Sequence, residues 1–224
     1  MPKPLIKVKG EEMYTRATES LPLRMASKLI FVVLRSHVNE YCIDKMIQTR
    51  FGKLPIKIVV VDKVTSGQSE TVSIALNGED VSLPLLVFNA DSAFEDNVEA
   101  TLKVLDPDVD GAVQYFYDSD PRWSFIRLDS YRNVTETAEK NPISNCASSG
   151  LYYFRRAETF LNCEKMTYRT NGERYIAPLY NTLIQRGHRI VGIPVKKYYC
   201  FGTPRDLEEY LSGKCYTGEG GAEL

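Results

Sequence analysis

Residues 28–35 read KLIFVVLR, and residues 55–61 read PIKIVVV. Both stretches are almost unbroken runs of apolar residues, a composition typical of strands that are buried on both faces. The segment between them, residues 37–51, has the pattern of a helix. A strand, a helix and a second strand in this order predict a parallel sheet covered by helices.

The same alternation continues through the first half of the chain, with a helix expected at residues 67–76 and a third strand at 83–89. Beyond residue 110 the pattern changes to strands with little helix between them, which favours antiparallel pairing. These later elements are strands at 112–117, 123–128, 134–138, 150–154 and 189–195, and helices at 173–186 and from 204 onward. The sequence therefore predicts an α/β fold.

The composition limits the function classes that fit. A chain of 224 residues suits one domain, which we expect at residues 1–215, with a flexible tail at 216–224. With 28 basic and 29 acidic residues the net charge is −1, which argues against nucleic acid or an anionic membrane as partner.

The chain has no sequence signal for export or for crossing a membrane. Its longest purely apolar run, residues 29–34, is far shorter than the ~20 residues that span a bilayer. The five cysteines include no C-x-x-C pair, which argues against a disulfide framework and a thiolate zinc site. We expect a cytoplasmic protein, and we leave open whether it forms a homo-oligomer.

An acidic residue, Asp91, follows the third strand directly in the sequence Asn89-Ala90-Asp91. In open α/β sheets, ligands bind outside the carboxyl ends of the strands, so Asp91 stands where a metal or substrate would bind. The structural alternative is an aspartate that caps a turn or helix.

The chain resembles the sugar-phosphate nucleotidyltransferases, including the glucose-1-phosphate thymidylyltransferase-like and capsule-pathway members, over nearly its whole length. Six pieces stand in the order of that family. They are Pro2-Lys3-Pro4-Leu5-Ile6, Thr65-Ser66-Gly67-Gln68, Asn89-Ala90-Asp91, Glu139-Lys140-Asn141-Pro142, Gly150-Leu151-Tyr152-Tyr153-Phe154, and Gly202-Thr203-Pro204 with Asp206-Leu207.

The resemblance implies a three-layer α/β/α sandwich with a mixed, mainly parallel central sheet. It also implies a magnesium-dependent reaction that transfers a nucleoside monophosphate unit from a nucleoside triphosphate to a sugar phosphate or similar metabolite. Pyrophosphate leaves in that reaction, and the product serves surface polysaccharide biosynthesis. The substrates implied are therefore the triphosphate and the phosphorylated acceptor.

The resemblance also implies roles for individual residues. Lys3 and Asp91 match the catalytic lysine and the aspartate that holds Mg²⁺. Gly67, Gln68 and Asn89 match positions at the nucleotide, and Glu139, Lys140 and Gly150 match positions at the acceptor. A lysine ammonium can neutralise charge on phosphate oxygens, and a glycine allows the backbone to approach a flat base closely.

Two departures from the family pattern affect these expectations. The strand and glycine-rich loop that open the family, roughly 20 residues by ordinary element lengths, are not found before Pro2-Lys3-Pro4, and their loss predicts an interrupted sheet with uncovered strand faces. Cys200 stands where the family commonly has a second metal-binding aspartate, and a neutral thiol is a poor magnesium ligand. Asp62 is a conceivable substitute.

Two other function classes stay open at this point. A catalytically impaired homologue that acts as a binding or assembly module fits both departures. For this chain, the two departures predict weak or absent activity. A glycosyltransferase of similar architecture would need an Asp-x-Asp metal pair, whereas Asp91-Ser92-Ala93 lacks the second acid.

Overall fold

The computed structural model describes residues 1–165 and 172–219, and it confirms a mixed α/β fold. The strands are β1 (Lys7–Val8), β2 (Glu11–Glu12), β3 (Leu29–Leu34), β4 (Ile56–Val61), β5 (Leu85–Val87), β6 (Ser92–Glu95), β7 (Val109–Tyr117), β8 (Ser124–Leu128), β9 (Val134–Glu139), β10 (Cys146–Phe154), β11 (Arg189–Pro194) and β12 (Lys197–Cys200). The helices are α1 (Met13–Glu19), α2 (Arg35–Tyr41), α3 (Ile43–Phe51), α4 (Gln68–Ala75), α5 (Val98–Lys103), α6 (Ala157–Glu164), α7 (Ala177–Gln185) and α8 (Pro204–Leu211), with short 3-10 helices at Lys3–Leu5 and Leu23–Met25.

The main sheet has six strands in the described part of the chain, in the order β11-β7-β10-β8-β9, with β5 also paired to β10. β7 and β11 are parallel, and the other pairs are antiparallel. Strands β5, β7, β8 and β11 therefore all run in the same direction, with β10 between them running oppositely.

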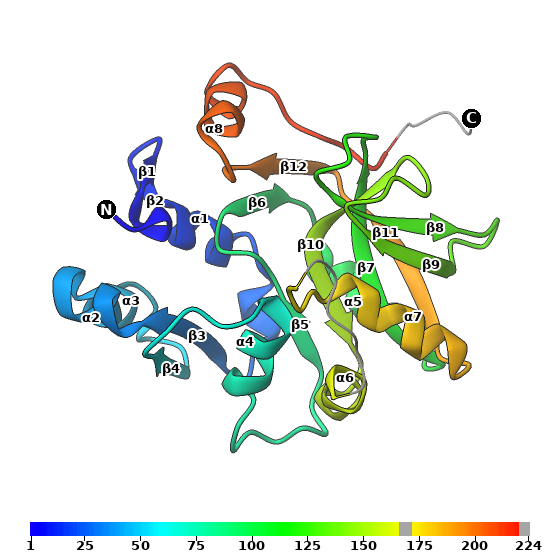
Figure 1. The fold of residues 1–224 in the computed structure, drawn as a ribbon, viewed down its shortest axis with the longest axis horizontal. Helices are drawn as coiled ribbons and strands as arrows, with labels where there is room; N and C mark the ends of the chain where they lie inside the picture. Colours follow the sequence, from blue (N-terminus) through cyan, green and yellow to red (C-terminus); the bar gives the residue numbers. More distant parts are fainter. Residues whose placement is uncertain (166–171, 220–224) are drawn as a thin grey trace.

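Alternating side chains of the main sheet pack on its two faces. Tyr115 of β7 belongs to a core that includes α6 and α7, whereas its neighbour Phe116 belongs to a core that includes residues of α5, β6 and β12. Figure 1 shows α6 and α7 on one side of the sheet and the β6–β12 ribbon with α8 at the top.

β3 and β4 form a parallel pair of their own, which no hydrogen bond between described strands joins to the main sheet. Figure 1 shows them at the left, apart from the long strands on the right. On one face, Phe31 and Val33 join a small core with α3. On the other face, Ile30, Val32 and Leu34 are only partly buried and belong to none of the four apolar clusters of the described residues.

The β3–β4 pair corrects one expectation and agrees with another. The apolar runs of β3 and β4 predicted burial on both faces, but nearly all of their residues are only partly buried, and among the described residues only one face joins an apolar cluster. The separation of β3 and β4 from the main sheet agrees with the interrupted sheet that the sequence predicted.

Several element boundaries differ from the sequence prediction. The helix expected at 37–51 is two helices, α2 and α3, because Cys42 adopts a left-handed backbone with φ of +53°. The helix expected at 173–186 begins at Ala177.

The first residues of the tail expected at 216–224 are hydrogen-bonded to the strands beside them. The amide and carbonyl of Tyr216 exchange hydrogen bonds with Tyr198 at 2.9 and 2.8 Å, and Gly218 donates to Val195 at 2.7 Å. Residues 220–224 lie outside the described residues. Among the residues that the structure describes, none lies in a helix long and apolar enough to span a bilayer.

Candidate functional site

The predicted catalytic residues Lys3 and Asp91 lie in direct contact, although 88 positions separate them. The Lys3 Nζ atom is 2.6 Å from Asp91 Oδ2. The Lys3 and Asp91 side chains are 45% and 32% exposed, so a ligand can reach the pair from solvent. The structure thus brings together the first and third pieces of the sequence resemblance.

Local folding explains how each of the two residues reaches this point. Lys3 opens a single 3-10 turn that is anchored by Leu5, which is 5% exposed and packs in the small core. Asp91 follows β5 and directly precedes β6. The Phe201 amide donates to the Asp91 carbonyl at 2.8 Å, so the end of β12 fixes the backbone of Asp91.

Three predicted ligand-binding residues form a second group. The Gln68 side-chain amide donates to Asn89 Oδ1 at 2.5 Å. Gly150 lies against the same asparagine, since a Cβ added to it would be 2.3 Å from Asn89 Nδ2, and its φ is +82°. Only glycine combines this close approach with a left-handed backbone.

Gly67, also predicted at the nucleotide, lies where the segment at Arg174 meets the start of α4. Its φ is +147°, and an added Cβ would lie 2.4 Å from the Arg174 carbonyl oxygen. The Arg174 amide donates to Ser66 at 2.9 Å, and the Ser69 amide donates to Arg174 at 3.0 Å. Gly67 therefore precedes α4 and lets the segment at Arg174 lie against the start of that helix.

Two residues at the end of β9, Glu139 and Lys140, were predicted to bind the acceptor substrate, and they contact different side chains. Glu139 accepts a hydrogen bond from Ser124, and burial raises the pKa of the Glu139 carboxyl against the effect of that bond. Lys140 donates to the Tyr175 hydroxyl at 2.8 Å, and this bond raises the pKa of Lys140. Within the described residues, no hydrogen bond or ion pair links either residue to Lys3 or Asp91.

Cys200, at the position of the expected second aspartate, is a neutral thiol. It is 8% exposed, and burial raises its pKa to about 12. Its Sγ accepts a hydrogen bond from the Gly202 amide at 3.3 Å. Asp62, the conceivable substitute, pairs with Arg35 and has a side chain that is 72% exposed.

Of the candidate metal ligands at this site, only the Asp91 carboxylate suits a magnesium ion. No group of three or more histidine, cysteine or acidic residues within the described ranges could hold a metal ion. Mg²⁺ in enzymes often takes one or two carboxylates and fills its other positions with substrate phosphates and water. The partly exposed carboxylate of Asp91 suits that role, and the thiol of Cys200 does not.

Sequence reasoning missed a buried acid close to Asp91. The point where a Cβ of Gly202 would lie is 3.3 Å from Asp206 Oδ2 and 4.0 Å from Asp91 Oδ2. The signal was present in the sequence, because Thr203 with Asp206 three residues later has the spacing of a helix capping box.

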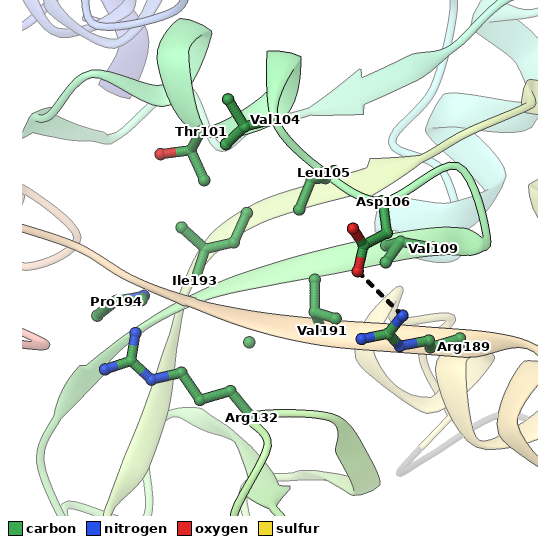
Figure 2. Close-up of a pocket in the computed structure, with 11 residues that line it drawn as sticks. Thr101, Val104, Leu105, Asp106, Val109, Arg132, Arg189, Val191, Ile193 and Pro194 are labelled. Atoms are coloured by element: carbon green, nitrogen blue, oxygen red, sulfur yellow. Dashed lines mark hydrogen bonds and ion pairs between the residues drawn. The ribbon is translucent and has the colours of Figure 1, made fainter.

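The structure also contains a hollow of about 250 Å³ between α5 and β11, shown in Figure 2. Its lining is mainly apolar and includes Val104, Val191 and Ile193, and Asp106 is ion-paired to Arg189 at its rim. None of the predicted site residues lines this hollow.

Comparisons with known proteins agree with the fold. A nucleoside-diphosphate-sugar pyrophosphorylase from Vibrio cholerae RC9 is 28% identical, with a TM-score of 0.78 over 95% of this chain and 92% of that chain. A putative glucose-1-phosphate thymidylyltransferase from Bacillus anthracis is 17% identical, with a TM-score of 0.77 over 94% of this chain and 85% of that chain. The inositol-1-phosphate CTP transferase from T. maritima is 14% identical, with a TM-score of 0.74 over 94% of this chain and 84% of that chain.

No protein-family model and no curated protein matches the chain. The fold places the chain among α/β proteins with the nucleotidyltransferase architecture. More particularly, the structural neighbours of this chain are nucleotide-sugar pyrophosphorylases and sugar-phosphate nucleotidyltransferases, which confirms the resemblance inferred from the sequence.

Proposed function

We propose that this chain is a magnesium-dependent nucleotidyltransferase that makes a nucleotide-linked sugar, or a similar metabolite, for surface polysaccharide biosynthesis. The contact between Lys3 and Asp91 at the exit of β5 is the observation that carries the proposal. It joins a cation suited to phosphate oxygens with a carboxylate suited to a divalent ion.

In the proposed reaction, an oxygen of the acceptor phosphate attacks the α-phosphorus of the triphosphate. The bond between the α-phosphorus and the bridging oxygen to the β-phosphorus breaks, and pyrophosphate leaves with that electron pair. No protein nucleophile is needed, because alignment of the two phosphates supplies much of the rate enhancement.

The residues of the site divide this work. Lys3 neutralises charge on the non-bridging oxygens, and Asp91 holds Mg²⁺, which when bound offsets the negative charge of the triphosphate. Gln68 and Asn89 hold each other in place and contact the nucleotide, and Gly150 leaves room beside them. We assign Glu139 and Lys140 to the acceptor, on the strength of the sequence resemblance.

The test is a coupled assay for pyrophosphate. The chain is incubated with Mg²⁺, each of the four nucleoside triphosphates in turn, and a panel of sugar 1-phosphates. We expect pyrophosphate only with a matching pair, and none when EDTA removes the metal. Absence of pyrophosphate with every pair would overturn the enzymatic proposal.

A second candidate function is favoured by two observations. The separate β3–β4 pair and the thiol at Cys200 are both departures from a complete site. They fit a chain that binds nucleotides or partners without catalysis. Nucleotide binding by calorimetry, without pyrophosphate release in the assay above, would identify this case.

A further inference from the structure

Asp206 is a fully bonded, buried carboxylate beside the candidate site. It is 3% exposed. Its Oδ1 accepts from Arg122 Nη1 at 2.5 Å, and its Oδ2 accepts from the amide and hydroxyl of Thr203 at 2.9 and 2.7 Å. Although burial opposes it, the Arg122 guanidinium and Thr203 hold the pKa of Asp206 below its usual value. Asp206 is therefore an anion held in one orientation.

Arg122 is itself fixed by its surroundings in the connection between β7 and β8. Its guanidinium lies 4.0 Å from the centre of the Trp123 ring, and its Nη2 donates to the Tyr216 hydroxyl at 3.0 Å. Tyr216 in turn pairs through its backbone with Tyr198 of β12. Arg122 thus joins α8 to the packed aromatic side chains of the main sheet.

The turn at residues 201–203 lies between Asp206 and Asp91 and is bonded to both. At one end, the Phe201 amide donates to the Asp91 carbonyl at 2.8 Å. At the other end, the Thr203 amide donates to Asp206. Gly202, between them, has Oδ2 atoms of both aspartates within 4.0 Å of its Cβ position. Any movement of this turn displaces the backbone that orients Asp91.

We propose that Asp206, locked by Arg122, is the positioning residue that holds the turn at residues 201–203 and thereby orients the carboxylate of Asp91. Asp206 is not a metal ligand, because both of its oxygens are already engaged by Arg122 and Thr203. The proposal rests on the proposed function in one respect: the carboxylate that it orients is assigned there to Mg²⁺. Partners behind a metal ligand typically change metal affinity by 10- to 100-fold when they are removed.

The first test compares two carboxylate-to-amide changes on the same helix, Asp206→Asn and Glu208→Gln. Glu208 is exposed and serves as the matched control. Binding of Mn²⁺, used in place of Mg²⁺, is followed by the electron paramagnetic resonance signal of the free ion. We expect Asp206→Asn to weaken binding by about 10-fold or more and Glu208→Gln to leave it unchanged. Equal affinities in the two variants would overturn the proposal.

A second measurement does not depend on the metal. Hydrogen exchange of the Phe201 amide, which bonds to the Asp91 carbonyl, reports whether the turn is still held. We expect faster exchange of this amide in Asp206→Asn than in Glu208→Gln, and unchanged protection would contradict the positioning role. If the parent chain binds no Mn²⁺ but the Phe201 amide exchanges faster in Asp206→Asn, the metal assignment fails and the positioning role stands.

A milder variant tests whether these effects come from lost positioning of the turn or from general destabilisation of the protein. Arg122→Lys keeps the positive charge and loses the planar fork that holds both Asp206 and Tyr216. We expect a smaller change in the same direction for Mn²⁺ affinity and for Phe201 exchange. A loss of thermal stability with unchanged Mn²⁺ affinity and unchanged Phe201 exchange would mean that the Arg122–Asp206 pair is purely structural, which would contradict the proposal.

Discussion

At the scale of the residue, the site depends on a few side chains whose surroundings determine their charge. Asp91 is held at its backbone by Phe201 and at its carboxylate by Lys3. Cys200, which pairs with Ser92 next to Asp91, is kept neutral by burial. A single exposed carboxylate therefore carries the assignment of the metal.

Replacement of this carboxylate tests the assignment directly. We expect Asp91→Asn to lower magnesium-dependent pyrophosphate release by about 100-fold or more, because an electrostatic contact at the phosphates is lost. The melting temperature should change little, since an exposed ion pair such as Lys3–Asp91 contributes only about 0–1 kcal/mol. Pyrophosphate assays and thermal melts by circular dichroism measure the two effects. Full activity in the variant would remove Asp91 from the mechanism.

Gly150 provides a second prediction at this scale, with a control in the same chain. Gly150 and Gly78 both have positive φ values, +82° and +77°, but only Gly150 has an atom within 4 Å of an added Cβ. We expect both alanine variants to carry backbone strain of roughly 1–3 kcal/mol, and Gly150→Ala to lose further stability by pushing Asn89 away from Gln68. Urea unfolding measures the stability, and nucleotide titration measures affinity. Equal stability and affinity in the two variants would show that the contact with Asn89 is unimportant.

At the scale of the element, patterns of apolar residues predicted where strands occur better than they predicted which strands pair and which faces join a core. The runs at β3 and β4 were predicted from sequence, but only the structure shows that, among the described residues, one face of the pair joins an apolar cluster and the other does not. The predicted helix at 37–51 is divided at Cys42, whose backbone is left-handed. The spacing of apolar residues along the segment does not reveal this break. β6 and β12 are four residues long and pair across about 100 positions, so local sequence gives them no signal.

The two faces of β3 give a prediction for this element. Val33 is 7% exposed and belongs to the small core, whereas Val32 is partly buried and belongs to no apolar cluster of the described residues. We expect Val33→Ala to reduce the free energy of unfolding by about 2 kcal/mol and Val32→Ala by under about 1 kcal/mol. Urea unfolding of both variants measures the difference. A greater cost at Val32 would mean that its face is covered in solution.

At the scale of the whole molecule, packing decides which cysteines can react. Cys42 and Cys215 are exposed, whereas Cys146, Cys163 and Cys200 are buried and form no disulfide. Burial raises the pKa of all three buried thiols. Thiolates are the reactive form, so these three should resist modification in the folded chain.

A thiol titration tests this arrangement. With 5,5′-dithiobis(2-nitrobenzoate) at pH 8, we expect two fast equivalents from the native chain, from Cys42 and Cys215, and five after denaturation. Absorbance at the thiol product's maximum measures the count. Rapid reaction of a third thiol, mapped by mass spectrometry to Cys200, would show that the site is more open than the structure describes.

The order of apolar and helical segments, together with six short motifs, determined the α/β class, the family resemblance and the choice of Lys3 and Asp91, because these features are local along the chain. The tertiary structure alone decided the contact between those two residues, the partners of Gly67 and Gly150, the separation of β3–β4 from the main sheet, and the pairing of Arg122 with the buried Asp206. Each of them joins segments far apart in sequence, and burial and strand pairing across such distances depend on how the elements pack rather than on any local pattern.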